Sequence, residues 1–393
     1  MVDSGSTRLL FSLASPRPAD ESFAAVERLS RLAPAWEDFL NRAERARLLP
    51  LVAWRLQRRP GISPQNQDRL AEIFHQNNLR NLVRVRELIR VCRELEKNEI
   101  RALAIKGPVL ATLCYHNLGS RSFDDLDLLI HPEDVSRTLS LLLNSGYDHW
   151  LPEWDRRHLK QFFSRPDFLR FLWWDQAMLT RDNPRMTVEI HWAALPRYFS
   201  FELPFEKLWR DRRAVSISGH KFPTLSAEDL LLLIAAHGAK HLWSSPKWTC
   251  DLAWAIHEFS EVEWEQVEGQ ARQKGGLRML RVGALLAARL FAASPQPEWL
   301  ACLQTDPVAD RLAREIECSL LQSVEDDSPF PEPLGRKLRL RERRLDQIRY
   351  LQRSLLTPSS RDCRWISLPP PLFPLYRLVR PLRLALEALH SRD

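Results

Sequence analysis

The chain has 393 residues, of which 45% are hydrophobic and 27% charged, a composition typical of a soluble globular protein with two or three domains. Its net charge of +7 is compatible with a phosphate-rich partner such as a nucleotide, a nucleic acid or an anionic membrane, and equally with solvated arginine-rich helices. No uninterrupted apolar run reaches the length that a membrane-spanning helix needs, which excludes that class of protein.

The six cysteines are scattered and form no CxxC pair, which excludes a zinc knuckle and a disulfide framework. Scattered cysteines are typical of a reducing compartment, so we expect a cytoplasmic protein. The N-terminal apolar segment LLFSLA lacks a basic lead-in and is too short for a signal peptide.

Residues 22–97 are predicted to be helical, because apolar side chains recur three and four positions apart on both sides of a Pro-Gly turn. The pattern changes at residues 100–105 (IRALAI), a short apolar run that is followed by Lys-Gly-Pro at 106–108. This order predicts a strand, a tight turn and the start of a helix, PVLATLCYHNL.

A second strand is expected at residues 123–130 (FDDLDLLI), before a helix that begins with Pro132 and acidic residues and ends near Gly146. Residues 151–183 are rich in Trp, Phe and Arg and show no assignable pattern. Residues 186–195 (MTVEIHWAAL) are a further strand candidate. We therefore predict an α/β (α+β) fold, in which helices pack on a small mixed sheet.

The helical period returns at Ser226, which forms a variant of a capping box with Asp229, and continues to about residue 323. An acidic, proline-rich stretch at 324–335 predicts a loop or linker, and a strongly basic run follows at 336–349. Four parts are predicted: an N-terminal helical region at 1–97, the sheet at 98–225, a C-terminal helical domain at 226–323, and a linker with a basic tail at 324–393.

Asp125 and Asp127 are the first candidate functional residues. Alternate side chains of a strand share a face, so both carboxylates point one way, while Leu126 and Leu128 face the core. Adjacent carboxylates repel each other unless a cation neutralises them, and oxygen ligands suit a hard ion such as Mg²⁺. Two solvated acids at a strand end explain the spacing as well. Asp124 points away and is not assigned to the site.

Glu189 supplies a third carboxylate if its strand lies beside the first, an adjacency that the sequence leaves open. Glu189 shares one strand face with His191, opposite Val188 and Ile190. His191 then either supports the metal site or bonds phosphate, and an ordinary structural histidine is the alternative.

Lys106 and Gly107 stand between a strand and a helix N-terminus. A glycine at such a point allows the backbone to approach a phosphate closely, and the helix end favours the anion. Lys106 would add a positive charge there, although an ordinary turn explains the same pair.

Taken in order, five segments resemble the uncharacterised nucleotidyltransferase family of bacterial proteins, within the DNA polymerase β-like superfamily. The segments are AIKGPVLATLCYHN, GSRSFDDLDLLIHPEDV, GY, MTVEIHW and LLLLIAAHGAKHLWSSPKWTCDLAWAI. The resemblance covers roughly residues 30–320. Its most specific part is the joint order of KG, R-x-x-x-D-x-D and a later acidic-x-His-Trp strand.

The resemblance implies that the protein transfers a nucleoside monophosphate from an NTP to a hydroxyl-bearing acceptor, with two Mg²⁺ ions and release of pyrophosphate. It places the catalytic and metal-binding acids at Asp125, Asp127 and Glu189. Gly107, with Lys106, falls where the superfamily has a Gly-Ser pair that grips the triphosphate, but its distance to Asp125 along the chain is longer than usual. Arg121 matches an arginine before the acidic strand, which implies a role on phosphate.

His237 and His241 lie four positions apart on a predicted helix, but the pattern lacks the glutamate of HExxH, which argues against zinc. The segment resembles the helical part of the family that faces the site. Lys240 and His241 are therefore added to the predicted nucleotide-binding residues. His191 is added because it lies beside Glu189 on the same strand face. Ordinary helix packing explains the two residues on this helix as well.

Two other functions stay open. A non-catalytic regulatory protein would keep the fold and bind a nucleotide or a partner protein without releasing pyrophosphate. A membrane-surface protein would act through the basic tail by contact with an anionic membrane. The same tail could instead bind nucleic acid, and a solvated amphipathic helix explains its pattern as well. Neither the base of the NTP nor the acceptor, which is a small molecule, a protein or an RNA end, follows from the sequence.

Overall fold

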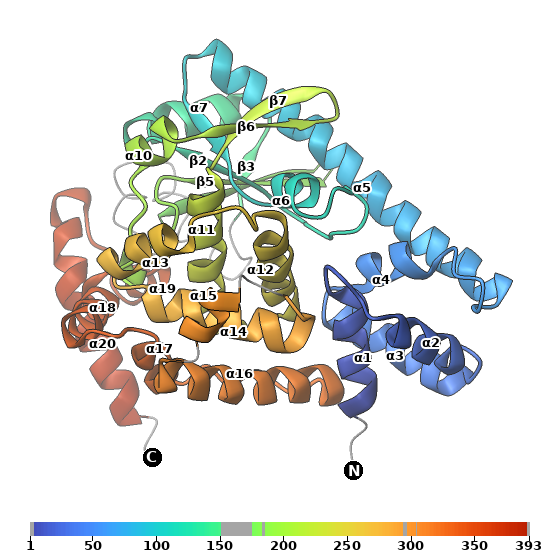
Figure 1. Ribbon diagram of the computed structural model, residues 1–393. Coiled ribbons are helices and arrows are strands. Elements are labelled where there is room, and N and C mark those ends of the chain that lie inside the picture. Colours follow the sequence, from blue (N-terminus) through green and yellow to red (C-terminus); the bar gives the residue numbers. More distant parts are fainter. Residues whose placement is uncertain (1–3, 151–174, 183–184, 294–296, 304, 391–393) are drawn as a thin grey trace.

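A computed structural model describes residues 4–150, 175–182, 185–293, 297–303 and 305–390 (Figure 1). Helices flank a mixed sheet on both faces, which confirms the predicted α/β class. Part of the stretch that showed no pattern in the sequence, residues 151–174, lies outside the described residues.

Five strands of the described residues form the main sheet, in the order β1-β2-β5-β4-β3. They are β1 (Ala102–Ala104), β2 (Leu126–Ile130), β5 (Arg185–His191), β4 (Gln176–Asp182) and β3 (Asp148–His149). β2 and β5 run parallel, whereas the other neighbours are antiparallel. β1 and β2 lie within the predicted segments, and β5 begins one residue before the segment predicted at 186–195, whereas β3 and β4 are not among the predictions.

One face of the sheet is apolar because every second side chain of β2 and β5 points to it. Leu128 and Ile190 on this face belong to one hydrophobic cluster with side chains of α5 (Pro64–Lys97) and α7 (Val135–Asn144). A short 3₁₀ turn, η1 (Pro132–Asp134), precedes α7. The two helices therefore cover this face, and the polar side chains of the same strands must point to the other.

The opposite, polar face of the sheet looks toward α11 (Ala227–Lys240) and α12 (Pro246–Glu258). The Ser226 hydroxyl accepts a hydrogen bond from the Asp229 backbone at 3.2 Å, so the predicted cap of α11 is confirmed. A two-stranded hairpin joins the sheet to α11. Its strands are β6 (Arg213–Ile217) and β7 (His220–Thr224).

Helices from both ends of the chain share a second hydrophobic cluster, which contains Phe11, Phe39, Leu286 and Ile316. The N-terminal helices are α1 (Ser4–Ala14), α2 (Asp20–Leu29), α3 (Ala33–Arg45) and α4 (Leu49–Leu56). α1 lies beside α14 (Leu277–Phe291) and α16 (Pro307–Asp326), as Figure 1 shows. The remaining short elements are α6 (Pro108–Leu113), η2 (Arg197–Phe199), α10 (Phe205–Arg210), α13 (Trp264–Gln273) and α15 (Pro297–Leu303).

The C-terminal region is helical rather than extended. It contains α17 (Leu334–Arg339), α18 (Arg344–Leu356), α19 (Ser360–Trp365), η3 (Pro370–Leu375) and α20 (Tyr376–His390). The loop predicted at 324–335 is shorter than expected, because α16 continues to Asp326 and α17 begins at Leu334.

The basic run at 336–349 is only partly solvated. Arg339 forms a two-pronged ion pair with Glu315 at 2.7 and 2.9 Å. Arg341 is 1% exposed, donates to the Phe199 carbonyl and stacks over the Tyr350 ring at 3.8 Å. These arginines therefore pack the C-terminal helices onto the body of the protein. Among the described residues, no helix combines the length and apolar character that crossing a bilayer requires.

Candidate functional site

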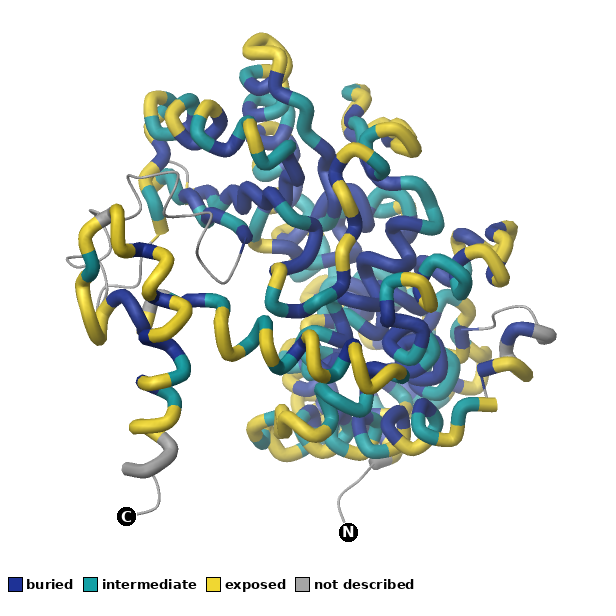
Figure 2. Tube along the Cα trace, turned by 90° about the vertical axis from the view of Figure 1, so that its left-hand side faces the viewer, coloured by how far each residue is buried: buried dark blue, intermediate teal, exposed yellow. Residues whose placement is uncertain are grey.

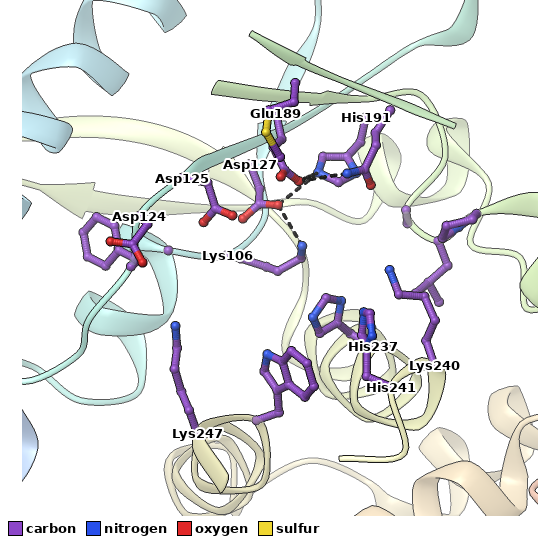
Figure 3. A pocket seen from close by; sticks show the side chains of 18 of the residues that line it. Lys106, Asp124, Asp125, Asp127, Glu189, His191, His237, Lys240, His241 and Lys247 are labelled. Atoms are coloured by element: carbon purple, nitrogen blue, oxygen red, sulfur yellow. Dashed lines mark hydrogen bonds and ion pairs between the residues drawn. The ribbon is translucent and has the colours of Figure 1, made fainter. Parts of the chain in front are cut away.

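A cavity of about 620 Å³ lies between the polar face of the sheet and the two helices α11 and α12. Acidic side chains of β2 and β5 line one wall, and lysines and histidines line the opposite wall (Figure 3). The residues predicted for the site that line this cavity are Lys106, Gly107, Arg121, Asp125, Asp127, Glu189, His191, Lys240 and His241. All nine predicted site residues therefore meet at one place in the fold.

Asp127 and Glu189 are direct neighbours across the parallel pairing of β2 and β5. Both face the cavity because they alternate with Leu128 and Ile190, which point to the covered face. Asp127 is 5% exposed and Glu189 is 8% exposed. Ligand atoms of Asp127, Glu189 and His191 lie within 4.8 Å of one another, so these three side chains can share one metal ion.

Asp127 is bonded by two cationic or potentially cationic groups. The Lys106 ammonium donates to Asp127 Oδ1 at 2.7 Å, and His191 Nε2 lies 2.9 Å from the same oxygen. Burial alone raises the pKa of Asp127, but Lys106 and His191 outweigh burial and hold this pKa well below its usual range. Lys106 is thus bonded to an acid of this cluster rather than standing apart as a free phosphate-binding charge.

Glu189 has its own contacts. Its Oε2 accepts a hydrogen bond from the Gln176 amide at 3.1 Å and lies 3.4 Å from His191 Nε2. Gln176 belongs to β4, whose pairing with β5 places it opposite His191. The carboxylate is therefore oriented by Gln176 of the adjacent strand and by His191 of its own strand.

Asp125 precedes β2 and points into the same cavity as Asp127 (Figure 3). The negative charge of Asp127, together with burial and the charge of Glu189, raises the pKa of Asp125 to about 6. Its carboxylate is not in the group that lies within 4.8 Å, which among the described residues comprises Asp127, Glu189 and His191. Asp125 thus lies next to this cluster, and the negative charge of the cluster favours the protonated form of its carboxyl group.

Gly107 forms the turn between β1 and α6 with φ +48° and ψ −114°, a conformation that L side chains rarely adopt. A Cβ atom at this position would lie 3.3 Å from the Asp125 carbonyl oxygen. The glycine therefore permits the close approach of the 106–108 turn to the acidic strand. α6 has only six residues, so it is shorter than the helix predicted for phosphate binding.

Arg121 is buried and engaged within the protein. It donates to both carboxylate oxygens of Asp251, at 2.7 and 2.8 Å, and to the Gly107 carbonyl at 3.3 Å. Tyr115 also donates to Asp251, at 2.8 Å, and the Asn81 amide holds the Arg121 carbonyl at 2.8 Å. These contacts tie the loop before β2 to α12 and α5, so Arg121 positions the turn at Gly107.

The opposite wall of the cavity carries Lys240 and Lys247. In the part of the chain that the structure describes, neither ammonium has a hydrogen-bond or ion-pair partner. Burial, together with the nearby Lys106, lowers the pKa of Lys240 to about 8. Burial and the neighbouring Arg121 lower the pKa of Lys247 to about 8 as well. Two lysines without a bonded partner among the described residues thus face the acids across the cavity.

His237, His241 and Trp248 form an aromatic group next to these lysines. The His241 ring stacks on Trp248 with centroids 4.7 Å apart, and His237 meets Trp248 edge-on at 5.4 Å. Burial lowers the pKa of His237 well below its ordinary value and that of His241 to about 3. Both imidazoles are therefore uncharged at neutral pH, and the group offers a flat, apolar surface to a ligand.

A model of the family described as "Uncharacterised nucleotidyltransferase" matches residues 33–292, which include every residue of this site. The chain belongs to that nucleotidyltransferase family. Membership implies a transferase that uses a nucleotide substrate. No curated protein matches the chain.

The donor set of this nucleotidyltransferase-family site fits a divalent cation. Asp125, Asp127 and Glu189 bring three carboxylates into one cavity wall, where Lys106 and His191 are the bonded groups that offset them. Asp127, Glu189 and His191 would hold the ion, with Asp125 beside them. Oxygen donors of this kind suit Mg²⁺ or Mn²⁺.

Lys247 and Gln176 are site residues that the predictions omit, and Trp248 lies in the helical segment that the resemblance places at the site but was not assigned a role there. Lys247 precedes Asp251 by four positions on α12, so a helical reading of PKWTCD places both on one helix face. Gln176 gives no such signal, because β4 lies within residues 151–183, the stretch that shows no assignable pattern. Asp124, which was not assigned to the site, lies at the rim of the cavity, and Arg84 donates to its carboxylate at 3.3 Å.

Proposed function

We propose that this protein is a Mg²⁺-dependent nucleotidyltransferase that moves a nucleoside monophosphate from an NTP to a hydroxyl-bearing acceptor and releases pyrophosphate. The observation that carries the proposal is the direct pairing of Asp127 with Glu189, beside Asp125, in a chain of this family. Three carboxylates in one buried wall repel one another, and a divalent cation that also binds triphosphate relieves that repulsion.

The acids have separate tasks in this proposal. Asp127 and Glu189 would hold the cation together with His191, and Asp125 beside them adds a further carboxylate; when bound, the cation neutralises phosphate oxygens and lowers the pKa of the acceptor hydroxyl. Gln176 orients the carboxylate of Glu189 through its hydrogen bond. Glu189 also receives the proton of the attacking hydroxyl.

The phosphates would lie between the two walls of the cavity. Lys240 and Lys247 bind the outer phosphate oxygens as positive charges that face the acids, in place of the Gly-Ser pair. Gly107 brings the backbone of the turn close to the acidic strand, and Arg121 holds that turn through the Gly107 carbonyl. The group of His237, His241 and Trp248 supplies a surface on which the base can stack.

We infer a cytoplasmic location, because all six cysteines are free thiols and such thiols persist in a reducing compartment.

The test is to incubate the purified protein with each labelled NTP, Mg²⁺ and a cell extract, and to measure pyrophosphate and labelled product. We expect at least one NTP to be consumed with stoichiometric pyrophosphate. Asp127→Asn and Glu189→Gln should each lower the rate by about a hundredfold or more, because each removes a charged ligand of the cation.

Asp124→Asn is the matched control, since Asp124 is an exposed acid outside the cluster, and its rate should equal that of the wild type. Retention of the full rate by Asp127→Asn would sink the proposal. Tight Mg²⁺-dependent nucleotide binding without pyrophosphate release would support the alternative of a non-catalytic regulatory protein.

A further inference from the structure

α20 has an inverted distribution of side chains, with arginines inside and leucines outside. Arg380 and Arg383 are each 6% exposed and bind Asp362, at 3.3 and 2.6 Å. Asp362 itself is fully buried, and its carboxylate accepts hydrogen bonds from the backbone and hydroxyl of Ser359. These bonds fix the rotation of α20 about its own axis, because both arginines must face Asp362.

The consequence is an apolar stripe on the outer face. Leu375, Leu378 and Leu382, which we call the leucine stripe, are 43%, 61% and 60% exposed. Leu378 and Leu382 are four positions apart, so they lie on one side of α20, and Leu375 ends η3 directly before the helix. Figure 2 shows exposed residues along this helix, which leads down to the C-terminus. Turning the leucines inward would withdraw both arginines from Asp362.

The segments that precede α20 also expose apolar and basic side chains. Leu372, Trp365 and Ile366 are 44%, 44% and 41% exposed. Arg361 and Arg377 are exposed in the same region of the chain. Large apolar side chains in contiguous exposed positions are unusual on a soluble protein and mark a surface that contacts an apolar phase or partner.

The positive charge of the protein is concentrated in its C-terminal segment. Residues 328–393 contain 14 Lys and Arg against 6 Asp and Glu, an excess that exceeds the +7 of the whole chain. The preceding 327 residues are therefore close to neutral overall. The leucine stripe thus belongs to a segment of net positive charge, which attracts an anionic partner.

We propose that the leucine stripe and the basic groups around it dock on an anionic membrane surface. α20 lies in the plane of the interface, with the leucines among the upper acyl chains and the exposed Arg361 and Arg377 near lipid phosphates. Charge decides against a second copy of the chain as the occupant, since two such basic faces repel each other. This docking is independent of the proposed nucleotidyl transfer.

The experiment is co-sedimentation of the full chain with phosphatidylcholine vesicles and with vesicles that also contain phosphatidylglycerol. We expect the protein to pellet with the anionic vesicles, to remain in solution with the neutral ones, and to be released by high salt. The double variant Leu378→Gln and Leu382→Gln should bind the anionic vesicles at least about tenfold more weakly, because two apolar side chains no longer leave water.

The matched control is the double variant Leu79→Gln and Leu82→Gln, which removes two exposed leucines from α5, on the other side of the molecule in Figure 1. It should bind vesicles like the wild type, and circular dichroism checks that both variants are folded. The proposal is overturned if the wild type does not pellet, or if the folded α20 variant pellets unchanged. The stripe would be assigned to a second copy of the chain if the wild type formed a dimer in gel filtration and did not bind vesicles. In that case the α20 variant should be monomeric and the α5 variant dimeric.

Discussion

Gly107 is the residue whose backbone conformation most directly permits the site. Substitution by alanine forces a side chain into φ +48° and places its Cβ 3.3 Å from the Asp125 carbonyl oxygen. We expect Gly107→Ala to lower the free energy of unfolding by about 1–3 kcal/mol. Urea denaturation measures this change.

Gly269→Ala is the matched control, because Gly269 lies within α13 and a Cβ there meets nothing within 4 Å. Alanine is the better helix former, so this variant should be as stable as the wild type or up to about 1 kcal/mol more stable. Equal stability of Gly107→Ala and the wild type would show that the turn relaxes without strain.

The two cavity lysines predict a pH dependence of nucleotide binding. Lys240 and Lys247 have pKa values of about 8 instead of the usual 10.5, so each loses its positive charge as the pH rises through 8. Phosphate binding requires the charged form. We expect NTP affinity to be constant below pH 8 and to fall above it, by up to about tenfold per pH unit for each lysine. Titration calorimetry between pH 6.5 and about 9.5 measures this profile.

Replacing both lysines by arginine distinguishes deprotonation of Lys240 and Lys247 from a general loss of structure at high pH. Arginine keeps its charge throughout this range, so the double variant Lys240→Arg and Lys247→Arg should lose the fall in affinity above pH 8. The double variant with methionine should bind weakly at every pH. A wild-type affinity that stays flat to pH 9.5 would exclude these lysines from phosphate binding.

At the scale of elements, α12 is fastened to the loop before β2 by Asp251. This carboxylate is 2% exposed and neutralises the buried Arg121. Asp251→Asn leaves the guanidinium without a countercharge, and we expect a loss of about 3–5 kcal/mol in the free energy of unfolding. Thermal or urea denaturation measures the loss.

Glu37→Gln is the comparison for Asp251→Asn, because the Glu37–Arg69 ion pair is about half exposed on both sides. Solvent screens such a pair, so the midpoint of unfolding should barely change. If Asp251→Asn and Glu37→Gln had the same free energy of unfolding, the buried Asp251–Arg121 ion pair would not be what holds α12 against the loop.

The elements that local patterns determine were predictable from the sequence. The alternation of Asp127 with Leu126 and Leu128 identified β2, and the Ser226 cap identified the start of α11. The neighbouring positions of Asp127 and Glu189 were not predictable, because strand order and register depend on contacts between distant segments. The Lys106–Asp127 bond has the same origin, since the register of β2 decides which acid lies beside the turn.

The least predictable element was α20, whose periodicity alone cannot tell which face is buried. Leucines would ordinarily face inward, and the contacts of Arg380 and Arg383 with Asp362 reverse this choice. The place of Lys247 in the site was not predictable from the sequence, because it depends on which side of α12 faces the sheet.

At the scale of the whole molecule, the site lies between two hydrophobic clusters. The apolar face of the sheet belongs to one hydrophobic cluster, and the helices from both ends of the chain share another. The cavity is formed where the polar side of the sheet meets α11 and α12. The predicted division of the chain into four parts remains a prediction.

The most direct test of the central claim is the binding of Mn²⁺ in the presence of a non-hydrolysable NTP analogue, followed by electron paramagnetic resonance of the free ion. Asp127 and Glu189 are proposed to hold the cation together, so Glu189→Gln should bind Mn²⁺ at least about tenfold more weakly than the wild type. Asp124→Asn should bind it equally well. Equal Mn²⁺ affinity of Glu189→Gln and the wild type would contradict the claim that the paired acids form the metal site.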